Sequence, residues 1–226
     1  MKIAIIGTGI SGLVAARELY QEHQLTIFEA ADRIGGHTHT IDVELEDGSY
    51  SIDTGFIVFN EANYPNFSTL VRELGIPTRK TTMSFSVRCD ESGLEYNGTN
   101  LNTIFAQRRN IARPRFLGML LDIRKFHRKA PNALNSSDDV TVSDFVQEHG
   151  LGAAFFEDYL LPLGSALWSS SIAQFAEFPI RFVAEFMHNH HMLQATNRPL
   201  WSVIEGGSIN YLEPLSMPFK HRIRTR

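Results

Sequence analysis

The residues with the clearest chemistry lie near the amino terminus of the chain. A short apolar run, Ile3-Ala4-Ile5-Ile6, leads into Gly7-Thr8-Gly9-Ile10-Ser11-Gly12. In this spacing the first glycine permits a tight turn, the second lets the backbone approach a pyrophosphate, and the third allows a following helix to pack closely. The start of that helix offers free N–H groups and the positive end of its dipole to the diphosphate.

An acidic residue follows at the spacing that a dinucleotide site requires. A second apolar run, Leu25–Phe28, ends on Glu29, which lies 22 residues after Gly7. A carboxylate at this position accepts hydrogen bonds from an adenosine ribose and repels a ribose 2′-phosphate. We therefore expect a strand–helix–strand unit, with the first strand buried and parallel, that binds a dinucleotide. The alternative is a unit whose glycines serve only packing.

The next segments indicate which dinucleotide binds. The chain continues with Ala30-Ala31-Asp32-Arg33-Ile34-Gly35-Gly36-His37 and, after a predicted hairpin, reaches Asp53-Thr54-Gly55-Phe56. At these residues it resembles the flavin-containing amine oxidase and phytoene desaturase superfamily, which joins a GxGxSG turn to an E-A-x-x-R-x-G-G run and a later D-x-G segment near the isoalloxazine ring. The resemblance implies FAD rather than NAD. It also implies an α/β fold, a Rossmann-like FAD/NAD(P)-binding domain with an inserted, mainly helical substrate region.

The predicted cofactor site combines the two glycine-rich turns, the acidic residue and the later segment. Its residues are Gly7, Gly9, Ser11, Gly12, Glu29, Ala30, Arg33, Gly35, Gly36, His37, Thr54, Gly55 and Phe56. No catalytic residue and no metal ligand is assigned. No Ser-His-Asp arrangement is evident, which is consistent with chemistry carried by a cofactor.

Further segments resemble a narrower branch of the superfamily. They are Asp53–Glu61, Met83–Ser86 and Trp201–Ser208, and the resemblance runs through nearly all of the chain. Members of this branch are bacterial flavoproteins often found beside cyclopropane-fatty-acid synthases, and they are also similar to the amino-terminal part of the plant synthases.

The chain departs from the superfamily in two respects. Many amine oxidases carry Arg after the Gly-Gly pair, where this chain has His37, whose imidazole still donates a hydrogen bond. Family members are also roughly twice as long, and their carboxyl-terminal half contributes flavin contacts and often a lysine near flavin N5. This chain stops at Arg226, so we expect a truncated member whose own activity is doubtful.

Composition limits the partners and the compartment. The net charge is −4 without a long run of either sign, so nucleic acid is not an implied partner. The single cysteine, Cys89, excludes an intrachain disulfide and is interpreted as a strand residue rather than a covalent flavin link. We find no signal-peptide pattern and no apolar window of about 20 residues, which favours a cytoplasmic protein. No oligomeric state is assigned.

The elements are predicted to follow three parts. Residues 1–100 form the FAD-binding part, with helices after Gly12 and over 64–74, a hairpin over 39–53 with an Asp47-Gly48 turn, and strands over 81–88 and 93–96. Residues 101–200 form the mainly helical part, with a helix from Pro114 to Lys129, a polar linker over 132–139, and a helix capped by Thr141 or Ser143 and closed by Gly150. Residues 201–226 begin the return to the first part, with a helix over 209–215.

Three other groups of residues carry weaker signals. His188, His190 and His191 are interpreted as a solvated helix end rather than a metal site, because no further ligand has a recognisable spacing. Aromatic residues over 155–186 are interpreted as core rather than as a tunnel for an apolar substrate; they are Phe155, Phe156, Tyr159, Trp168, Phe175, Phe178, Phe182 and Phe186. Basic residues over 108–129 form either a solvated face or a peripheral contact with anionic lipid; they are Arg108, Arg109, Arg113, Arg115, Arg124, Lys125, Arg128 and Lys129.

Three functions remain open. The first is an FAD-dependent oxidoreductase that dehydrogenates a C–N or C–C bond of a small molecule or lipid, with a preference for a lipid acyl chain. The second is a non-redox flavin isomerase similar to sugar-nucleotide mutases. The third is a fragment that binds nucleotide weakly or serves as an interaction module.

Overall fold

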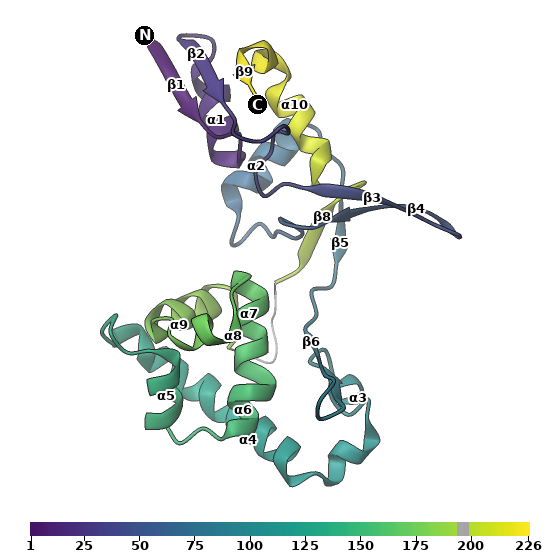
Figure 1. Ribbon diagram of the computed structural model, residues 1–226, viewed down its shortest axis with the longest axis vertical. Helices are drawn as coiled ribbons and strands as arrows, with labels where there is room; N and C mark the ends of the chain where they lie inside the picture. Colours follow the sequence, from purple (N-terminus) through teal and green to yellow (C-terminus); the bar gives the residue numbers. More distant parts are fainter. Residues whose placement is uncertain (194–198) are drawn as a thin grey trace. The chain divides into compact units, whose positions relative to one another are not determined.

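The structure, a computed structural model, describes residues 1–193 and 199–226 (Figure 1). It divides into two compact units. The first comprises Met1–Thr82 and Leu200–Arg226, and the second comprises Met83–Pro199. The chain therefore leaves the first unit 18 residues before the boundary expected at residue 100.

A three-stranded parallel sheet forms one end of the first unit. Its strands are β1 (Lys2–Ile6), β2 (Gln24–Phe28) and β9 (Ile223–Arg224), in the order β1-β2-β9. Helix α1 (Ile10–Leu19) connects β1 and β2 and buries Leu13 and Ala16 completely. This is the predicted strand–helix–strand unit.

The prediction that the first strand is buried is wrong. Ile6 is 80% exposed, and only Ile3 and Ile5 of the apolar run are half-buried. Among the described strands β1 has a neighbour on one side only, and α1 packs on the sheet through Leu13 and Ala16. An edge strand covered on one face buries alternate residues rather than a continuous run.

The predicted hairpin is formed by β3 (Thr40–Leu45) and β4 (Gly48–Asp53), whose register pairs Thr40 with Asp53 and Leu45 with Gly48. The two loop residues are Glu46 and Asp47, so Gly48 begins β4 instead of lying in the turn. Helix α2 (Pro65–Glu73) matches the predicted span and begins with proline in its first turn.

The strand predicted over 81–88 is wrong, because it joins two strands of different units. Strand β5 (Thr78–Thr81) pairs with β8 (Trp201–Ile204) in the first unit, and β6 (Ser86–Cys89) pairs with β7 (Leu94–Asn97) in the second. Cys89 is the last residue of β6, as a strand residue was predicted. The first unit ends with η4 (Ser208–Tyr211), α10 (Leu212–Ser216) and η5 (Met217–Arg222), which lie over the predicted helix and beyond it.

The second unit is mainly helical after its hairpin. Its helices are α3 (Leu101–Ile104), η1 (Arg108–Ala112), α4 (Pro114–Lys129), η2 (Ala130–Asn135), α5 (Val142–Glu148), α6 (Ala153–Phe155), the π-helical turn η3 (Phe156–Leu160), α7 (Leu161–Trp168), α8 (Ile172–Ala176) and α9 (Ile180–Asn189). Helix α4 has the predicted bounds. Thr141 caps α5 and exchanges hydrogen bonds with Asp144, which is the capping box.

The linker predicted over 132–139 is wrong. This segment lies inside the second unit, and its first residues belong to η2. Ala130 and Ala133 are buried in the same core as Phe126 and Phe155. Two small apolar residues are too few to produce a helical period in the sequence, so the polar residues after Asn135 dominated the prediction for this segment.

Candidate functional site

The turn between β1 and α1 is built on close backbone contacts. Gly7 has a φ of +91°, a conformation that favours glycine. A β-carbon on Gly12 would lie 2.1 Å from the carbonyl oxygen of Gly7. Gly7 also donates its N–H to the carbonyl of Phe28 at 2.7 Å, which ties the turn to β2. Only glycine fits at position 12, as the sequence predicts.

The amino terminus of α1 is open toward a ligand. Gly9 is the N-cap residue, no side chain caps it, and no acidic residue lies in the first turn. A β-carbon on Gly7 or on Gly9 would meet no atom within 4 Å. The first N–H groups of the helix therefore face space next to the positive end of its dipole, which is the arrangement that binds phosphate.

Thr8 fixes the acidic residue beside this turn, and the sequence analysis did not identify it. The side chain of Thr8 is buried. Its backbone N–H donates to Oε2 of Glu29 at 2.8 Å, and its hydroxyl donates to the same oxygen. The hydroxyl also accepts the N–H of Gly35 at 3.2 Å. A hydroxyl residue between the two glycines of a G-x-G turn was the available signal.

The carboxylate of Glu29 is held in its charged form. The hydrogen bond from the Thr8 side chain, followed by those from backbone N–H groups, lowers the pKa of Glu29 from 4.5 to about 2. Ala31 donates its N–H to Oε1 at 2.9 Å. Since a carboxylate oxygen accepts more than one hydrogen bond, Oε1 retains capacity for a hydroxyl donor.

A second glycine turn packs against the first. Gly35 donates its N–H to the carbonyl of Thr8 at 3.1 Å. A β-carbon on Gly36 would lie 2.9 Å from the α-carbon of Gly9, and one on Gly35 would lie 2.6 Å from the side chain of Leu212. The two predicted glycine-rich runs therefore meet backbone to backbone.

A cavity of about 480 Å³ opens at this junction. Eight of the predicted cofactor residues line it: Gly7, Gly9, Ser11, Gly12, Gly35, Gly36, His37 and Phe56. The other lining residues are Ile6, Ile10, Thr38, Tyr64, Phe67 and Tyr211. A second cavity of about 400 Å³ shares Ile10, Ser11, Tyr64 and Phe67 with it. We call the two together the glycine cleft.

Five predicted residues do not line this cavity. The carboxylate of Glu29 is hydrogen-bonded to Thr8 outside the cavity lining. Ala30 and Arg33 are exposed, and the guanidinium of Arg33 donates to the carbonyl of Thr38 at 3.3 Å. Thr54 and Gly55 support the cleft instead. The N–H of Thr54 donates to the carbonyl of His39 at 2.9 Å. A β-carbon on Gly55 would lie 2.0 Å from the carbonyl oxygen of His37.

Aromatic rings form one wall of the glycine cleft. Phe67 packs edge to face on Phe56 at 5.0 Å and on Tyr211 at 5.4 Å between ring centroids. Tyr211 is buried, and its hydroxyl shares a hydrogen bond with Thr38. Burial raises the pKa of Tyr211 above its ordinary value. The sequence analysis did not identify Tyr211, because it lies far along the chain from the glycine motif.

Asp53 anchors the returning chain to the hairpin. Its carboxylate accepts the N–H of Ser208 at 2.8 Å and the hydroxyl of Thr40 at 2.6 Å. A β-carbon on Gly207 would lie 2.5 Å from the side chain of Thr40. The Gly206-Gly207 turn thus brings η4 and Tyr211 to the cleft.

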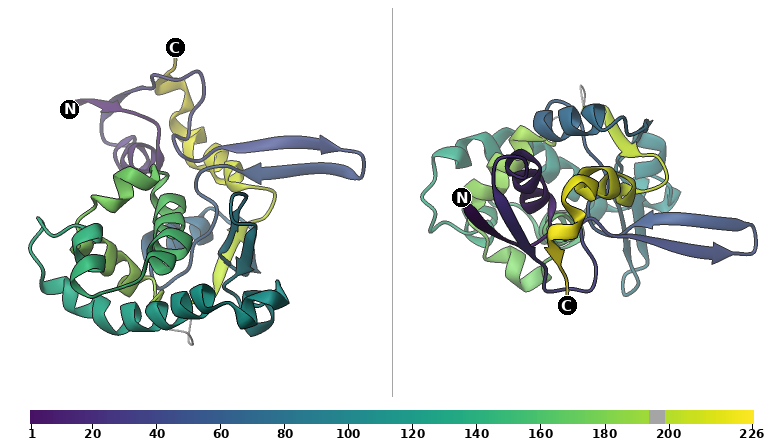
Figure 2. Two further views of the ribbon diagram at one scale, coloured as in Figure 1. Left: turned by 60° about the horizontal axis from the view of Figure 1, so that its bottom comes forward. Right: turned by 90° about the horizontal axis from the view of Figure 1, so that it is seen from above.

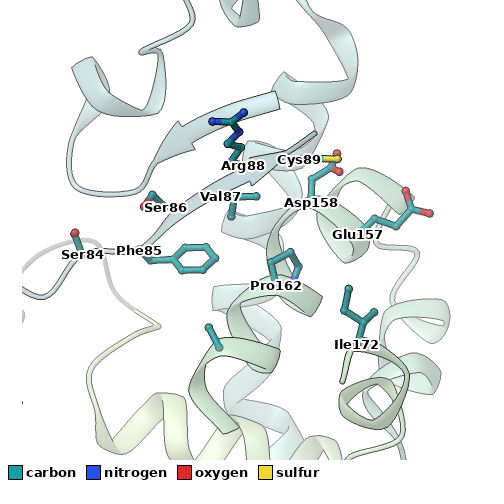
Figure 3. Close-up of a pocket in the computed structure, with 11 residues that line it drawn as sticks. Ser84, Phe85, Ser86, Val87, Arg88, Cys89, Glu157, Asp158, Pro162 and Ile172 are labelled. Carbon is teal, nitrogen blue, oxygen red and sulfur yellow. The ribbon is translucent and has the colours of Figure 1, made fainter. Parts of the chain in front are cut away.

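The second unit contains a separate cavity of about 570 Å³ (Figure 3). Residues 84–89 contribute one side, and Glu157, Asp158, Pro162, Ala166 and Ile172 contribute the other. Arg115 donates to Glu157 at 2.8 Å and to Asp158 at 3.2 Å, so the two carboxylates are paired. The carbonyl of Asp158 accepts the hydroxyl of Tyr96 at 2.7 Å.

The weaker signals have mixed outcomes. Phe155 and Phe175 are completely buried, which favours the core interpretation for them, whereas Phe182 is 49% exposed. Helix α9 ends at Asn189, and the ring of His190 stacks on Phe186 at 3.9 Å. Within residues 1–193 and 199–226, no group of three His, Cys, Asp or Glu side chains is placed to hold a metal ion. None of the helices in those residues is long and apolar enough to cross a membrane.

The glycine cleft fits the diphosphate of a dinucleotide. The open space at Gly7 and Gly9, the uncapped helix start and the fixed carboxylate of Glu29 are the features that this group requires. The family described as flavin-containing amine oxidoreductase matches residues 10–216.

Two curated relatives match shorter segments. The flavin-dependent L-tryptophan oxidase of Lentzea aerocolonigenes is 48% identical over 40 residues, which are 17% of this chain and 8% of the relative. The probable polyamine oxidase 4 of Arabidopsis thaliana is 34% identical over 92 residues, which are 39% of this chain and 17% of the relative.

Solved amine oxidases share the fold over the whole chain. The cyclohexylamine oxidase of Brevibacterium oxydans superposes with a TM-score of 0.69 and 17% identity, over 99% of this chain and 50% of that one. A putrescine oxidase bound to putrescine superposes with a TM-score of 0.64 and 18% identity, over 100% of this chain and 51% of that one. The chain thus spans about half the length of these solved relatives. The flavin-containing family match and the flavin-dependent relatives imply FAD as the cofactor.

Proposed function

This chain belongs to the flavin-containing amine oxidoreductase family, and on that premise we propose that its glycine cleft holds the ADP half of FAD. The observation that carries the proposal is the uncapped start of α1 at Gly9, with Glu29 fixed beside it by Thr8. The first N–H groups of the helix bind the diphosphate, and Oε1 of Glu29 accepts a ribose hydroxyl.

The remaining predicted residues take roles further along the cofactor. Ser11 stands in the first turn of α1 and adds a hydroxyl donor to the phosphates. Gly35, Gly36 and His37 line the cleft where the chain turns back toward Gly9. By the order of the family's motifs, Thr54, Gly55 and Phe56 would hold the isoalloxazine end of the cofactor, and Ala30 and Arg33 would hold the adenosine end.

The division of labour between the units follows from this assignment. The first unit is the nucleotide-binding part, and the second unit is part of the substrate domain. The second unit begins at Met83 in this proposal, because the hairpin of β6 and β7 packs with its helices. Residues 200–226 belong to the first unit, since β8 and β9 pair with β5 and β2.

The reaction that this arrangement supports best is oxidation of a C–N bond of a small amine. FAD, when bound, supplies the hydride acceptor. The relatives are named for oxidation of amines and an amino acid: cyclohexylamine, putrescine, polyamines and L-tryptophan. The chain's own contribution is to hold the cofactor and to wall the cleft with Phe56, Tyr64, Phe67 and Tyr211.

A second candidate is dehydrogenation of a C–C bond in a lipid acyl chain. Exposed leucines beside cationic side chains on α4 favour it, since Leu121 is 68% exposed next to Arg124 and Lys125. This surface suits an acyl lipid better than a small polar amine.

The test has two stages. The purified chain is first titrated with FAD, and binding is followed by flavin fluorescence and by absorption near 450 nm, a property of the cofactor itself. Binding that Gly9→Val abolishes supports the cleft, whereas binding that survives this substitution contradicts it. A chain that binds no FAD also contradicts it.

The FAD-loaded chain is then mixed without oxygen with amines or with lipid extracts. Bleaching of the flavin by amines supports C–N oxidation, and bleaching by lipids alone moves the reaction to a C–C bond. Turnover with an unchanged flavin spectrum indicates a non-redox isomerase instead.

A further inference from the structure

Helix α4 has two faces of different character. Its inner face carries Phe116, Met119 and Phe126, which are buried. On the opposite face Leu117, Leu121, Arg124 and Arg128 are spaced by four, three and four residues, so they form one stripe along the helix. All four of these side chains are exposed.

The apolar residues of this stripe are more open to solvent than a core helix requires. Leu117 is 38% exposed and Leu121 is 68% exposed, and Ile111 of the preceding η1 is 55% exposed. In the left view of Figure 2, α4 (teal) runs along the lower margin of the second unit, with the green helices of that unit above it. We call Leu117, Leu121, Arg124 and Arg128 the outer stripe of α4.

Positive charge is concentrated on the same segment. Eight of the 21 lysine and arginine residues of the chain lie between Arg108 and Lys129, with Asp122 as the single acidic residue in that span. The carboxylate of Asp122 accepts the N–H of Gly152 at 2.9 Å. Among the described residues, Arg124, Arg128 and Lys129 form no ion pair. These three cations therefore lack a counter-ion within the described residues, although the chain as a whole carries a net charge of −4.

We propose that the outer stripe of α4 docks on an anionic phospholipid surface. Arginine and lysine side chains reach lipid phosphates while their apolar stems lie along the interface. Leu117 and Leu121 enter the boundary between headgroups and acyl chains, as the apolar face of an interfacial helix does. The proposal does not depend on FAD binding or on the reaction.

The leucines distinguish a lipid surface from other anionic partners. A nucleic acid would use the cations and gain nothing from two exposed leucines, and its binding would respond only to charge. An acidic protein would bind without lipid. The leucines lie in the first half of the stripe and the cations in the second, so both kinds of side chain can contact one flat surface at the same time.

The experiment measures binding of the full chain to vesicles of phosphatidylcholine with and without phosphatidylserine, by co-sedimentation. We expect binding only with phosphatidylserine and weakening at high salt. Arg124→Gln with Arg128→Gln should weaken binding about 30-fold. Leu121→Ala should weaken it about fivefold and leave its salt dependence unchanged.

A matched control removes the same charge elsewhere. Arg79→Gln with Lys220→Gln neutralises two exposed cations outside α4 and should change binding less than about twofold, since neither lies on the stripe. Circular dichroism of each variant checks that it folds. Vesicle binding that the control and the stripe variants lose equally would overturn the proposal, as would no preference for phosphatidylserine. Binding of RNA or an acidic protein without vesicle binding would also overturn it.

Discussion

The glycine cleft and the cavity of the second unit are built from different materials. The cleft is shaped by backbone: Gly12 on the carbonyl of Gly7, Gly36 on Gly9, and the free N–H groups at the start of α1. The cavity of the second unit is shaped by side chains, with Arg115 paired to Glu157 and Asp158. A site made of backbone leaves its mark in the spacing of glycines, whereas a site made of side chains depends on tertiary packing.

The largest effect is expected from a substitution at Gly12. Gly12→Val should abolish FAD binding and destabilise the chain by about 3 kcal/mol, because the new side chain cannot avoid the Gly7 carbonyl. Gly118→Ala is the matched control: it lies in α4 with open space around it and should stabilise by about 0.5–1 kcal/mol. Thermal unfolding and FAD titration measure both. Retained FAD affinity in Gly12→Val would show that the turn is not the binding element.

A comparable clash in the second unit should act on stability alone. A β-carbon on Gly164 would lie 2.1 Å from the ring of Phe175, which is buried and stacked on Trp168 at 5.5 Å. Gly164→Ala should cost about 2 kcal/mol in unfolding free energy. FAD affinity at low temperature should be unchanged. If affinity falls with stability, the cleft is not a property of the first unit.

Substitutions at Thr8 test how the glycine cleft fixes the carboxylate of Glu29. Thr8→Val keeps the volume and removes the hydroxyl that bonds Glu29 and Gly35. We expect a loss of about 1–2 kcal/mol in unfolding free energy by urea titration, together with weaker FAD binding. Thr8→Ser restores the hydroxyl and should recover most of both. Equal stability and equal FAD affinity in the two variants would mean that the Thr8 hydroxyl contributes to neither.

The smallest expected effect is a pH dependence from Glu29. A carboxyl whose folded pKa is lowered contributes stability above its unfolded pKa and loses it as the pH falls toward the folded value. For Glu29 that window runs from 4.5 down to about 2. Because the side chain is partly exposed, we expect this carboxylate to contribute only about 1 kcal/mol to the free energy of unfolding. Urea unfolding across this range should be steeper in pH for the wild type than for Glu29→Gln; parallel curves would contradict the assignment.

The sequence predicted the features that depend on backbone and glycine spacing better than those that depend on side-chain packing. The glycine spacing and the acid after the second strand gave the strand–helix–strand unit, and eight of the predicted cofactor residues line one cavity. Thr8 and Tyr211 could not be found in this way. Thr8 acts through hydrogen bonds that only the folded turn creates, and Tyr211 comes from a segment more than 170 residues away in the chain.

Two of the errors share one cause. The strand predicted over 81–88 and the linker predicted over 132–139 are both failures to locate where the chain changes unit. A polar stretch was interpreted as a boundary, although Ala130 and Ala133 anchor its start in the core. The first crossing between the units, at Thr82, leaves no signal in the amino-acid composition, because strands lie on either side of it.

The central claim is that the ADP half of FAD rests on the start of α1. Hydrogen–deuterium exchange of the full chain with and without saturating ADP tests it most directly, since each backbone amide reports its own protection. We predict slower exchange at residues 9–13 and 35–38 and no change over residues 101–130. Protection elsewhere, or none at the glycine turns while ADP is bound, would contradict the account.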